Sequence, residues 1–204
     1  MELFVIRHTE VNNPENLCYG NIEMPLVGNY EKKSKKFLDN LPENIEKIFS
    51  SPSKRCTDLL ECMNLEFSKR TELKELDFGD WEGRKWIEIN KADLNTWMND
   101  FIYKSPKNGE KMIDLYNRVI DFTKNIFTMN LSKVLFVTHA GVIRALLSKG
   151  LEISLEDTFN IKINHDEIFS FKVNYQKELE LSFLQMLNIN NMEIRKTFSK
   201  QQKY

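Results

Sequence analysis

The sequence contains few cysteines, and they form no pattern. Of its 204 residues only Cys18, Cys56 and Cys62 are cysteines, and none lies in a CxxC pair or beside a histidine at metal-ligand spacing. An odd number of scattered cysteines argues against a disulfide framework and against a structural zinc site. We therefore expect reduced thiols, as in cytoplasmic proteins.

Neither an excess of one charge nor a long apolar run is present. The chain has 29 Lys and Arg against 30 Asp and Glu, a net charge of -1, so no overall field attracts nucleic acid or membrane surfaces. Its apolar runs are too short to span a bilayer, and the start MELFVIRHTE lacks the pattern of a secretory signal. We expect a cytoplasmic protein with neither nucleic-acid nor membrane partners; no oligomeric state is predicted.

What the sequence does contain is an alternation of strand-like and helix-like segments. Apolar runs rich in strand formers predict strands over residues 2–6, 45–49, 67–70 and 134–137. Helical spacing predicts helices over residues 29–41, 52–63, 85–101, 112–126 and 141–150. Two later apolar runs flank a polar turn and predict an antiparallel hairpin over residues 167–173 and 179–186. The alternation predicts one α/β domain with a mostly parallel sheet over residues 1–190, followed by a polar tail, frayed or loosely helical, over 191–204.

Two of the three histidines directly follow a strand pattern. His8 ends VIRH and His139 ends FVTH. In open parallel sheets, ligands gather at the carboxyl ends of the strands, so both histidines are expected at one edge of the sheet. A single histidine in such a place would be interpreted as a core side chain. Two at equivalent positions indicate a site.

Two arginines accompany these histidines. Arg7 precedes His8, and Arg55 lies in the first turn of the helix that begins within SSPSKRC. A helix N-terminus and guanidinium groups together suit a phosphate group. The sequence has no P-loop pattern and no dense carboxylate cluster for Mg²⁺, so side chains must supply the positive charge. In such a pocket His8 can act as a nucleophile, because neighbouring arginines favour its neutral form.

An acidic loop can supply the proton that a leaving alkoxide needs. The stretch ELKELDFGDWEG covers residues 72–83 and mixes carboxylates with glycine and aromatic residues. Partial burial of a carboxyl group among such residues raises its pKa toward working pH. Such a stretch can also be an ordinary solvated turn. Its spacing does not choose among Glu72, Glu75, Asp77, Asp80 and Glu82.

Taken together, five motifs resemble the histidine phosphatase superfamily, the phosphoglycerate mutase-like proteins. They occur in the order typical of that family and are RHTE (7–10), SSPSKRC (50–56), LKELDFGDWEG (73–83), NGE (108–110) and VTHAGVIRALL (137–147). The resemblance implies a three-layer α/β/α sandwich whose mostly parallel sheet has an antiparallel edge. It also implies no metal and no organic cofactor. CYGNIEMPL (18–26) is similar to the α-ribazole phosphatase branch, which removes phosphate from α-ribazole 5'-phosphate in cobalamin nucleotide-loop assembly.

The resemblance also implies roles for individual residues. His8 corresponds to the phosphorylated nucleophile, and Glu75 to the proton donor of the family's L-x-E-x-x-x-G segment. The other phosphate-pocket side chains are Arg7, Arg55 and His139. The implied substrate-binding positions are Asn13, preferred to Asn12, together with Tyr19, Gly20 and Ala140. The substrate expected on these grounds is a small-molecule phosphate monoester.

Other functions remain open from the sequence. Thr9 replaces the glycine that usually follows Arg-His in the family, and Glu23 replaces the aspartate of the branch motif, so substrate identity is less defined than catalysis. A broad-specificity phosphatase and a phosphoglycerate mutase share the motifs. A catalytically inactive module that binds a phosphorylated ligand shares them too. The last alternative is a metal-dependent hydrolase with His8 and His139 as ligands.

Overall fold

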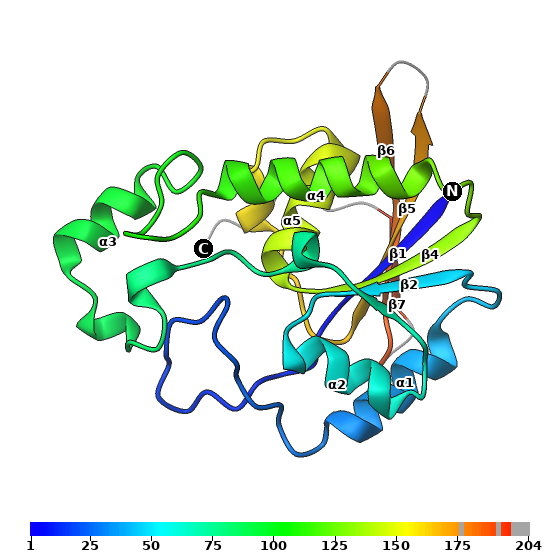
Figure 1. Ribbon diagram of the computed structural model, residues 1–204, viewed down its shortest axis with the longest axis horizontal. Coiled ribbons are helices and arrows are strands. Elements are labelled where there is room, and N and C mark those ends of the chain that lie inside the picture. The colour runs from blue at the N-terminus through cyan, green and yellow to red at the C-terminus, as the bar shows by residue number, and fades with distance from the viewer. Residues whose placement is uncertain (176–177, 191–192, 197–204) are drawn as a thin grey trace.

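A computed structural model describes residues 1–175, 178–190 and 193–196 (Figure 1). In this part of the chain the strands form one seven-stranded sheet with the order β3-β2-β4-β1-β5-β6-β7. Their bounds are β1 Glu2–Arg7, β2 Lys47–Ser50, β3 Ser68–Lys69, β4 Lys133–Thr138, β5 Glu167–Tyr175, β6 Leu179–Asn188 and β7 Glu193–Arg195. The pairs from β3 to β1 are parallel, and those from β1 to β7 are antiparallel.

Helices cover both faces of the sheet. The longer helices are α1 Tyr30–Asn40, α2 Lys54–Cys62, α3 Lys91–Met98, α4 Met112–Phe127 and α5 Ala140–Leu151. The short 3-10 helices are η1 Thr71–Leu73, η2 Gly79–Trp81, η3 Trp86–Glu88 and η4 Asp157–Asn160. Figure 1 shows α4 and α5 on one side of the sheet and α1 and α2 on the other. The predicted three-layer α/β/α sandwich, mostly parallel with an antiparallel edge, is confirmed.

Alternate residues of the central strands enter two separate cores. Val5 and Phe136 pack with side chains of α4 and α5, such as Phe122. Ile6 and Val137 point to the opposite face and pack with side chains of α2, such as Leu59. A strand buried on both faces needs apolar residues at successive positions, which explains the continuous runs in the sequence.

One predicted helix is wrong. Residues 85–101 form η3 and α3 instead of a single helix, and the break falls at Asn90. The Asn90 side-chain oxygen accepts hydrogen bonds from the backbone N–H groups of Ala92 and Asp93, so Asn90 starts a new helix instead of continuing the previous one.

The end of the described chain also differs from the prediction. The hairpin of β5 and β6 is confirmed. Residues 193–195, assigned above to a frayed or helical tail, instead form β7 and pair with β6. The rest of that tail, residues 191–192 and 197–204, lies outside the described residues.

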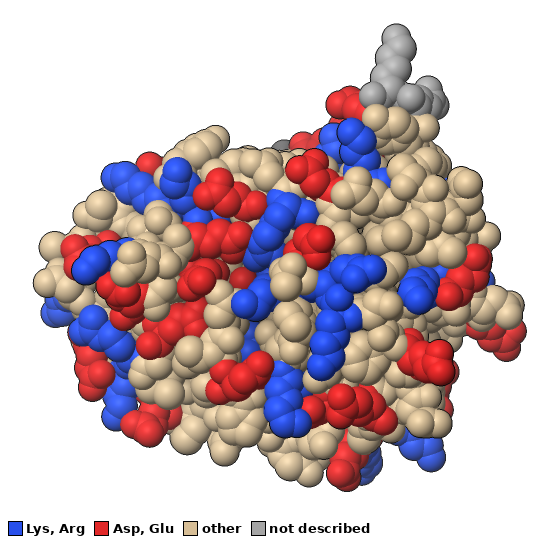
Figure 2. Space-filling view, viewed as in Figure 1, with Lys and Arg blue, Asp and Glu red and all other residues tan. Residues whose placement is uncertain are grey.

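The molecular surface carries both signs of charge. On the face shown in Figure 2, acidic and basic side chains of the described residues are intermixed, in agreement with the net charge of -1. Among the described residues, no helix combines the length and apolar character needed to cross a bilayer.

Candidate active site

The strand register brings His8 and His139 together. Parallel pairing of β1 with β4 sets Arg7 opposite Thr138, so the two histidines leave the sheet side by side at its carboxyl edge. Their ring centroids are 5.2 Å apart. His8 is 1% exposed and His139 is fully buried. The histidine pair expected from the sequence is therefore adjacent and well shielded from bulk water.

A backbone contact orients the His8 ring. Its Nδ1 lies 2.7 Å from the carbonyl oxygen of Thr9. Because a carbonyl oxygen can only accept, Nδ1 carries the proton and Nε2 carries the lone pair. Burial, and then the charges of Arg7 and Arg55, hold the pKa of His8 well below its usual value. At neutral pH His8 is thus an uncharged imidazole with a free lone pair on Nε2.

His139 is held by Arg55 and by a serine that the sequence analysis did not single out. The Nε of Arg55 donates to His139 Nδ1 at 3.3 Å, which leaves the proton on Nε2, 2.8 Å from the Ser51 hydroxyl. Burial and the Arg55 charge lower the pKa of His139 well below its usual value. Ser51 follows β2 at the same sheet edge, where SSPSKRC predicted an anion site.

The Arg55 guanidinium is locked in place by the loop that follows β1. Arg55 is 1% exposed, and its terminal nitrogens donate to the carbonyl oxygens of Gly20 and Ile22. The Tyr19 ring lies beside it, 5.5 Å from the guanidinium carbon. At position 20 a Cβ atom would lie 1.8 Å from the carbonyl oxygen of Leu76, so only glycine allows this approach.

Glu82 holds the same loop through hydrogen bonds to its backbone. Its carboxylate accepts hydrogen bonds from the backbone N–H groups of Asn21, Ile22 and Phe78 at 2.6–3.1 Å. This acidic residue therefore shapes the loop around Arg55.

Arg7 completes the positive side of the site. Its Nη1 donates to the carbonyl oxygen of Ile163 at 3.0 Å. Its Nε is buried and has no hydrogen-bond partner among the described residues. A buried guanidinium N–H without a partner is costly in the absence of an anion, which suits a site that binds one.

Among the five acidic candidates, Glu75 is the one that reaches helix α5 next to His139. Its Oε1 accepts hydrogen bonds from the backbone N–H groups of Leu76 and Gly141, each at 3.0 Å. A Cβ atom at position 141 would lie 2.3 Å from Oε1, so the glycine makes room for the carboxylate. The remaining candidates have other partners: Asp77 accepts from Gly79, and Asp80 pairs with Asn108 and Lys107.

A partly buried ion pair supports the Glu75 loop. Arg118 of α4 pairs with Glu110 at 2.7 Å and donates to the backbone carbonyl oxygens of Glu72 and Glu75. The sequence analysis quoted NGE (108–110) as a family motif but gave Glu110 no role. In the structure Glu110 has a positioning role, because it orients Arg118, which in turn holds the loop of Glu72 and Glu75.

The residues that the family resemblance implies for substrate binding differ in what they contact. Ala140 is the first residue of α5, directly after His139. Asn13 is turned inward on its own loop: its amide oxygen accepts from the Leu17 N–H and its amide nitrogen donates to the Leu17 carbonyl oxygen. Both polar atoms of Asn13 are therefore engaged, whereas Tyr19 and Gly20 contact Arg55 as described above.

His165 is the main site residue that sequence reasoning missed. Its ring centroid is 5.3 Å from that of His8, and its Nδ1 lies 2.6 Å from the His8 carbonyl oxygen. The antiparallel pairing of β5 with β1 brings the loop before β5 to the edge where β1 ends. The predicted hairpin alone could not reveal this, because it did not show which strand β5 pairs with.

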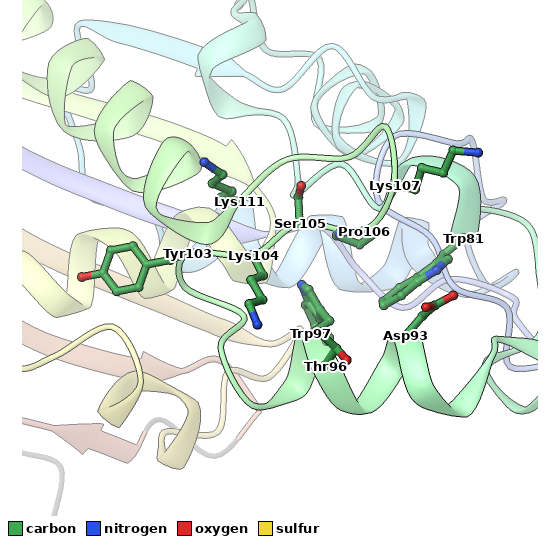
Figure 3. Close-up of a pocket in the computed structure, with 10 residues that line it drawn as sticks. All are labelled: Trp81, Asp93, Thr96, Trp97, Tyr103, Lys104, Ser105, Pro106, Lys107 and Lys111. Atoms are coloured by element: carbon green, nitrogen blue, oxygen red, sulfur yellow. The ribbon is translucent and has the colours of Figure 1, made fainter.

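Of two cavities in the described structure, one is lined by a residue of the site and the other is not. One of about 430 Å³ opens between η2, α3 and the loop 103–107, and its wall includes Trp81, Trp97 and Lys104 (Figure 3). The other, about 370 Å³, has Glu75 in its wall. Among the described residues, no group of three or more His, Cys, Asp or Glu side chains is arranged to hold a metal ion.

Comparisons with known proteins agree with the geometry. Residues 3–183 match the family model described as the histidine phosphatase superfamily (branch 1). The chain is 27% identical to phosphoserine phosphatase 1 of Hydrogenobacter thermophilus, covering 76% of this chain and 78% of the relative. It is 25% identical to the adenosylcobalamin/alpha-ribazole phosphatase of Escherichia coli, covering 80% and 86%.

A solved structure shows the same fold. The crystal structure of the alpha-ribazole phosphatase from Shigella flexneri superposes with a TM-score of 0.78 and 24% identity, over 90% of this chain and 96% of that one. The phosphoglycerate mutase-like fold and the family expected from the sequence motifs are both confirmed. The chain belongs to the histidine phosphatase superfamily, branch 1.

Proposed function

We propose that this chain is a metal-independent phosphomonoesterase that works through a phosphohistidine on His8. One observation carries the proposal: the lone pair of His8 Nε2 belongs to a neutral, buried ring surrounded by Arg7, Arg55 and His139. A neutral nucleophile among cations suits a dianionic phosphate ester, because the cations bind the oxygens and leave the lone pair free.

The reaction divides into two transfers. In the first, His8 Nε2 attacks phosphorus, the ester P–O bond breaks, and protonated Glu75 gives its proton to the leaving oxygen. In the second, water attacks phosphorus, the P–N bond breaks, and the Glu75 carboxylate takes a proton from that water. Guanidinium groups stabilise the phosphoryl oxygens in both steps. Phosphate and an alcohol leave, and the enzyme returns to its starting state.

Replacing Glu75 by Gln tests the role of proton donor. A Gln oxygen can still accept from the Gly141 N–H but has no acidic proton to give. We expect kcat/KM for alkyl phosphates to fall by about 10²–10⁴ and that for p-nitrophenyl phosphate to change by less than about tenfold, because nitrophenolate leaves without protonation.

The measurement is a plot of log kcat/KM against the pKa of the leaving alcohol for wild type and variant. The matched control is Asp80→Asn, which removes a carboxylate from the same loop where it pairs with Asn108. An equal loss for alkyl and aryl esters would assign the proton to another group.

The first candidate substrate is α-ribazole 5'-phosphate. The stretch CYGNIEMPL is similar to that branch, and relatives named for this activity cover most of the chain. Of the aromatic residues near the site, Tyr19 is the one beside Arg55, whereas Trp81 is buried and packs edge-on against Trp97. Tyr19 is therefore the residue that we propose to contact the aromatic base of α-ribazole 5'-phosphate.

Phosphoserine is the second candidate, because a relative named phosphoserine phosphatase shares 27% identity with this chain. The test is phosphate release from α-ribazole 5'-phosphate, O-phosphoserine and 3-phosphoglycerate, with excess chelator present. We expect α-ribazole 5'-phosphate to have the highest kcat/KM. A clearly higher kcat/KM for O-phosphoserine would make phosphoserine the substrate instead. Comparable kcat/KM values for all three esters would indicate broad specificity. Loss of all activity in the presence of chelator would overturn metal independence.

A further inference from the structure

His165 lies beside the nucleophile but has no part in the two transfers described above. It is the third imidazole at the sheet edge, half-buried, with its ring centroid 5.3 Å from that of His8. It comes from the loop before β5, whereas His8 and His139 follow β1 and β4. His165 thus approaches His8 from a different side than His139 does.

The hydrogen bond to the His8 backbone defines which His165 nitrogen is protonated. Nδ1 donates to the His8 carbonyl oxygen at 2.6 Å, so Nε2 has the lone pair. Within the described residues, Nε2 has no hydrogen-bond partner, and it is not among the fully buried polar atoms. Burial and then the Arg7 charge lower the pKa of His165 to about 4, which keeps the ring neutral at pH 7. His165 therefore presents an uncommitted acceptor.

An acceptor at this place does not suit the phosphate itself. Phosphate oxygens accept hydrogen bonds, and the guanidinium groups of Arg7 and Arg55 are the donors for them. The other two imidazole lone pairs are committed, since His8 uses its own for attack and His139 faces Arg55. Besides Arg7, the charged neighbours of His165 are Glu10 and Lys33, which are paired with each other. What the His165 lone pair suits is an O–H or N–H donor carried by the substrate.

We propose that His165 is a specificity-determining residue, whose Nε2 accepts a hydrogen bond from a hydroxyl or ammonium group close to the phosphate ester. This inference rests on the proposed function, since the binding of the intact ester, with its phosphate in front of His8, is what brings the alcohol part next to His165. It selects phosphate esters of polyols, sugars and amino alcohols over those of plain alkyl alcohols.

The test compares glycerol 1-phosphate with propyl phosphate, which differ only in their hydroxyl groups. We expect wild-type kcat/KM to be about tenfold higher for glycerol 1-phosphate, the value of roughly one hydrogen bond. In His165→Asn the amide nitrogen can still donate to the His8 carbonyl oxygen, but nothing replaces Nε2, so the preference should disappear. In His165→Gln the longer side chain brings an amide oxygen toward the Nε2 position, and part of the preference should return.

Asp166→Asn is the matched control in the same loop, because Asp166 bonds Asn188 and not the site. It should keep the preference. Equal losses for both esters in His165→Asn, or the same loss of preference in Asp166→Asn, would overturn the inference and indicate a structural role. A wild type that cleaves p-nitrophenyl phosphate without preferring glycerol 1-phosphate would overturn the inference alone. A wild type that cleaves none of the three esters would overturn the proposed function and the inference together.

Discussion

We expect that replacing His8 by Ala abolishes phosphatase turnover and leaves the fold intact. The expected loss in kcat is about 10⁴-fold or more, the scale seen when a covalent nucleophile is removed. His139 is not placed to replace it, because its lone pair faces Arg55. His165 comes from the loop before β5, on the side of His8 opposite to His139, and its lone pair is assigned above to the alcohol part of the substrate. Among the described residues, the His8 side chain forms its hydrogen bond with the Thr9 carbonyl oxygen alone, and His8 belongs to neither core cluster, so its removal leaves both cores untouched.

The experiment measures kcat with p-nitrophenyl phosphate and thermal unfolding on the same preparations. Added imidazole should restore part of the activity of His8→Ala, because the truncated side chain leaves space beside the phosphate. Residual activity above about one per cent of wild type in the folded variant would show that His8 is not the nucleophile.

Replacing Arg55 by Ala should damage both catalysis and stability. Arg55 bonds the His139 ring and two backbone carbonyl oxygens, and it is almost completely buried. Loss of a preorganised donor to the phosphoryl oxygens lowers kcat by about 10²–10³. Loss of the carbonyl partners costs about 1–3 kcal/mol for each buried group left unpaired. We expect weaker inhibition by vanadate and a clearly lower unfolding temperature.

Two further variants separate these effects. Arg55→Lys keeps the positive charge but loses the planar guanidinium group and its several N–H donors. Its kcat and its unfolding temperature should therefore lie between those of wild type and Arg55→Ala. Lys54→Ala removes an adjacent cation of α2 whose side chain is 70% exposed and pairs with Asp58, and it should behave like wild type. An Arg55→Ala protein that melts early but keeps wild-type kcat/KM and vanadate inhibition would show that Arg55 serves only the fold.

The sheet and its edge could be predicted because the sequence records them directly. Strands buried on both faces need continuous apolar runs, and the polar residue that ends such a run marks the carboxyl edge. The sequence therefore predicts that His8 and His139 lie at the same edge of the sheet, and the parallel pairing of β1 with β4 places them side by side there.

Features that depend on tertiary contacts could not be predicted from the residues alone. The spacing of the acidic loop did not distinguish Glu75 from Asp77, because the difference comes from Arg118 and from space at Gly141. His165 was missed because its position depends on β5 pairing with β1. The helix break at Asn90 was missed because the apolar spacing continues across a residue that caps a new helix.

The most direct test of the account is to trap the covalent intermediate. The protein is mixed rapidly with a ³²P-labelled substrate, quenched in alkali to preserve phosphohistidine, and digested for mass spectrometry. The account predicts a label on His8 that survives alkali, is lost in acid, and is absent from His8→Ala. Turnover without any labelled protein, or a label that is stable to acid or located on another residue, would contradict it.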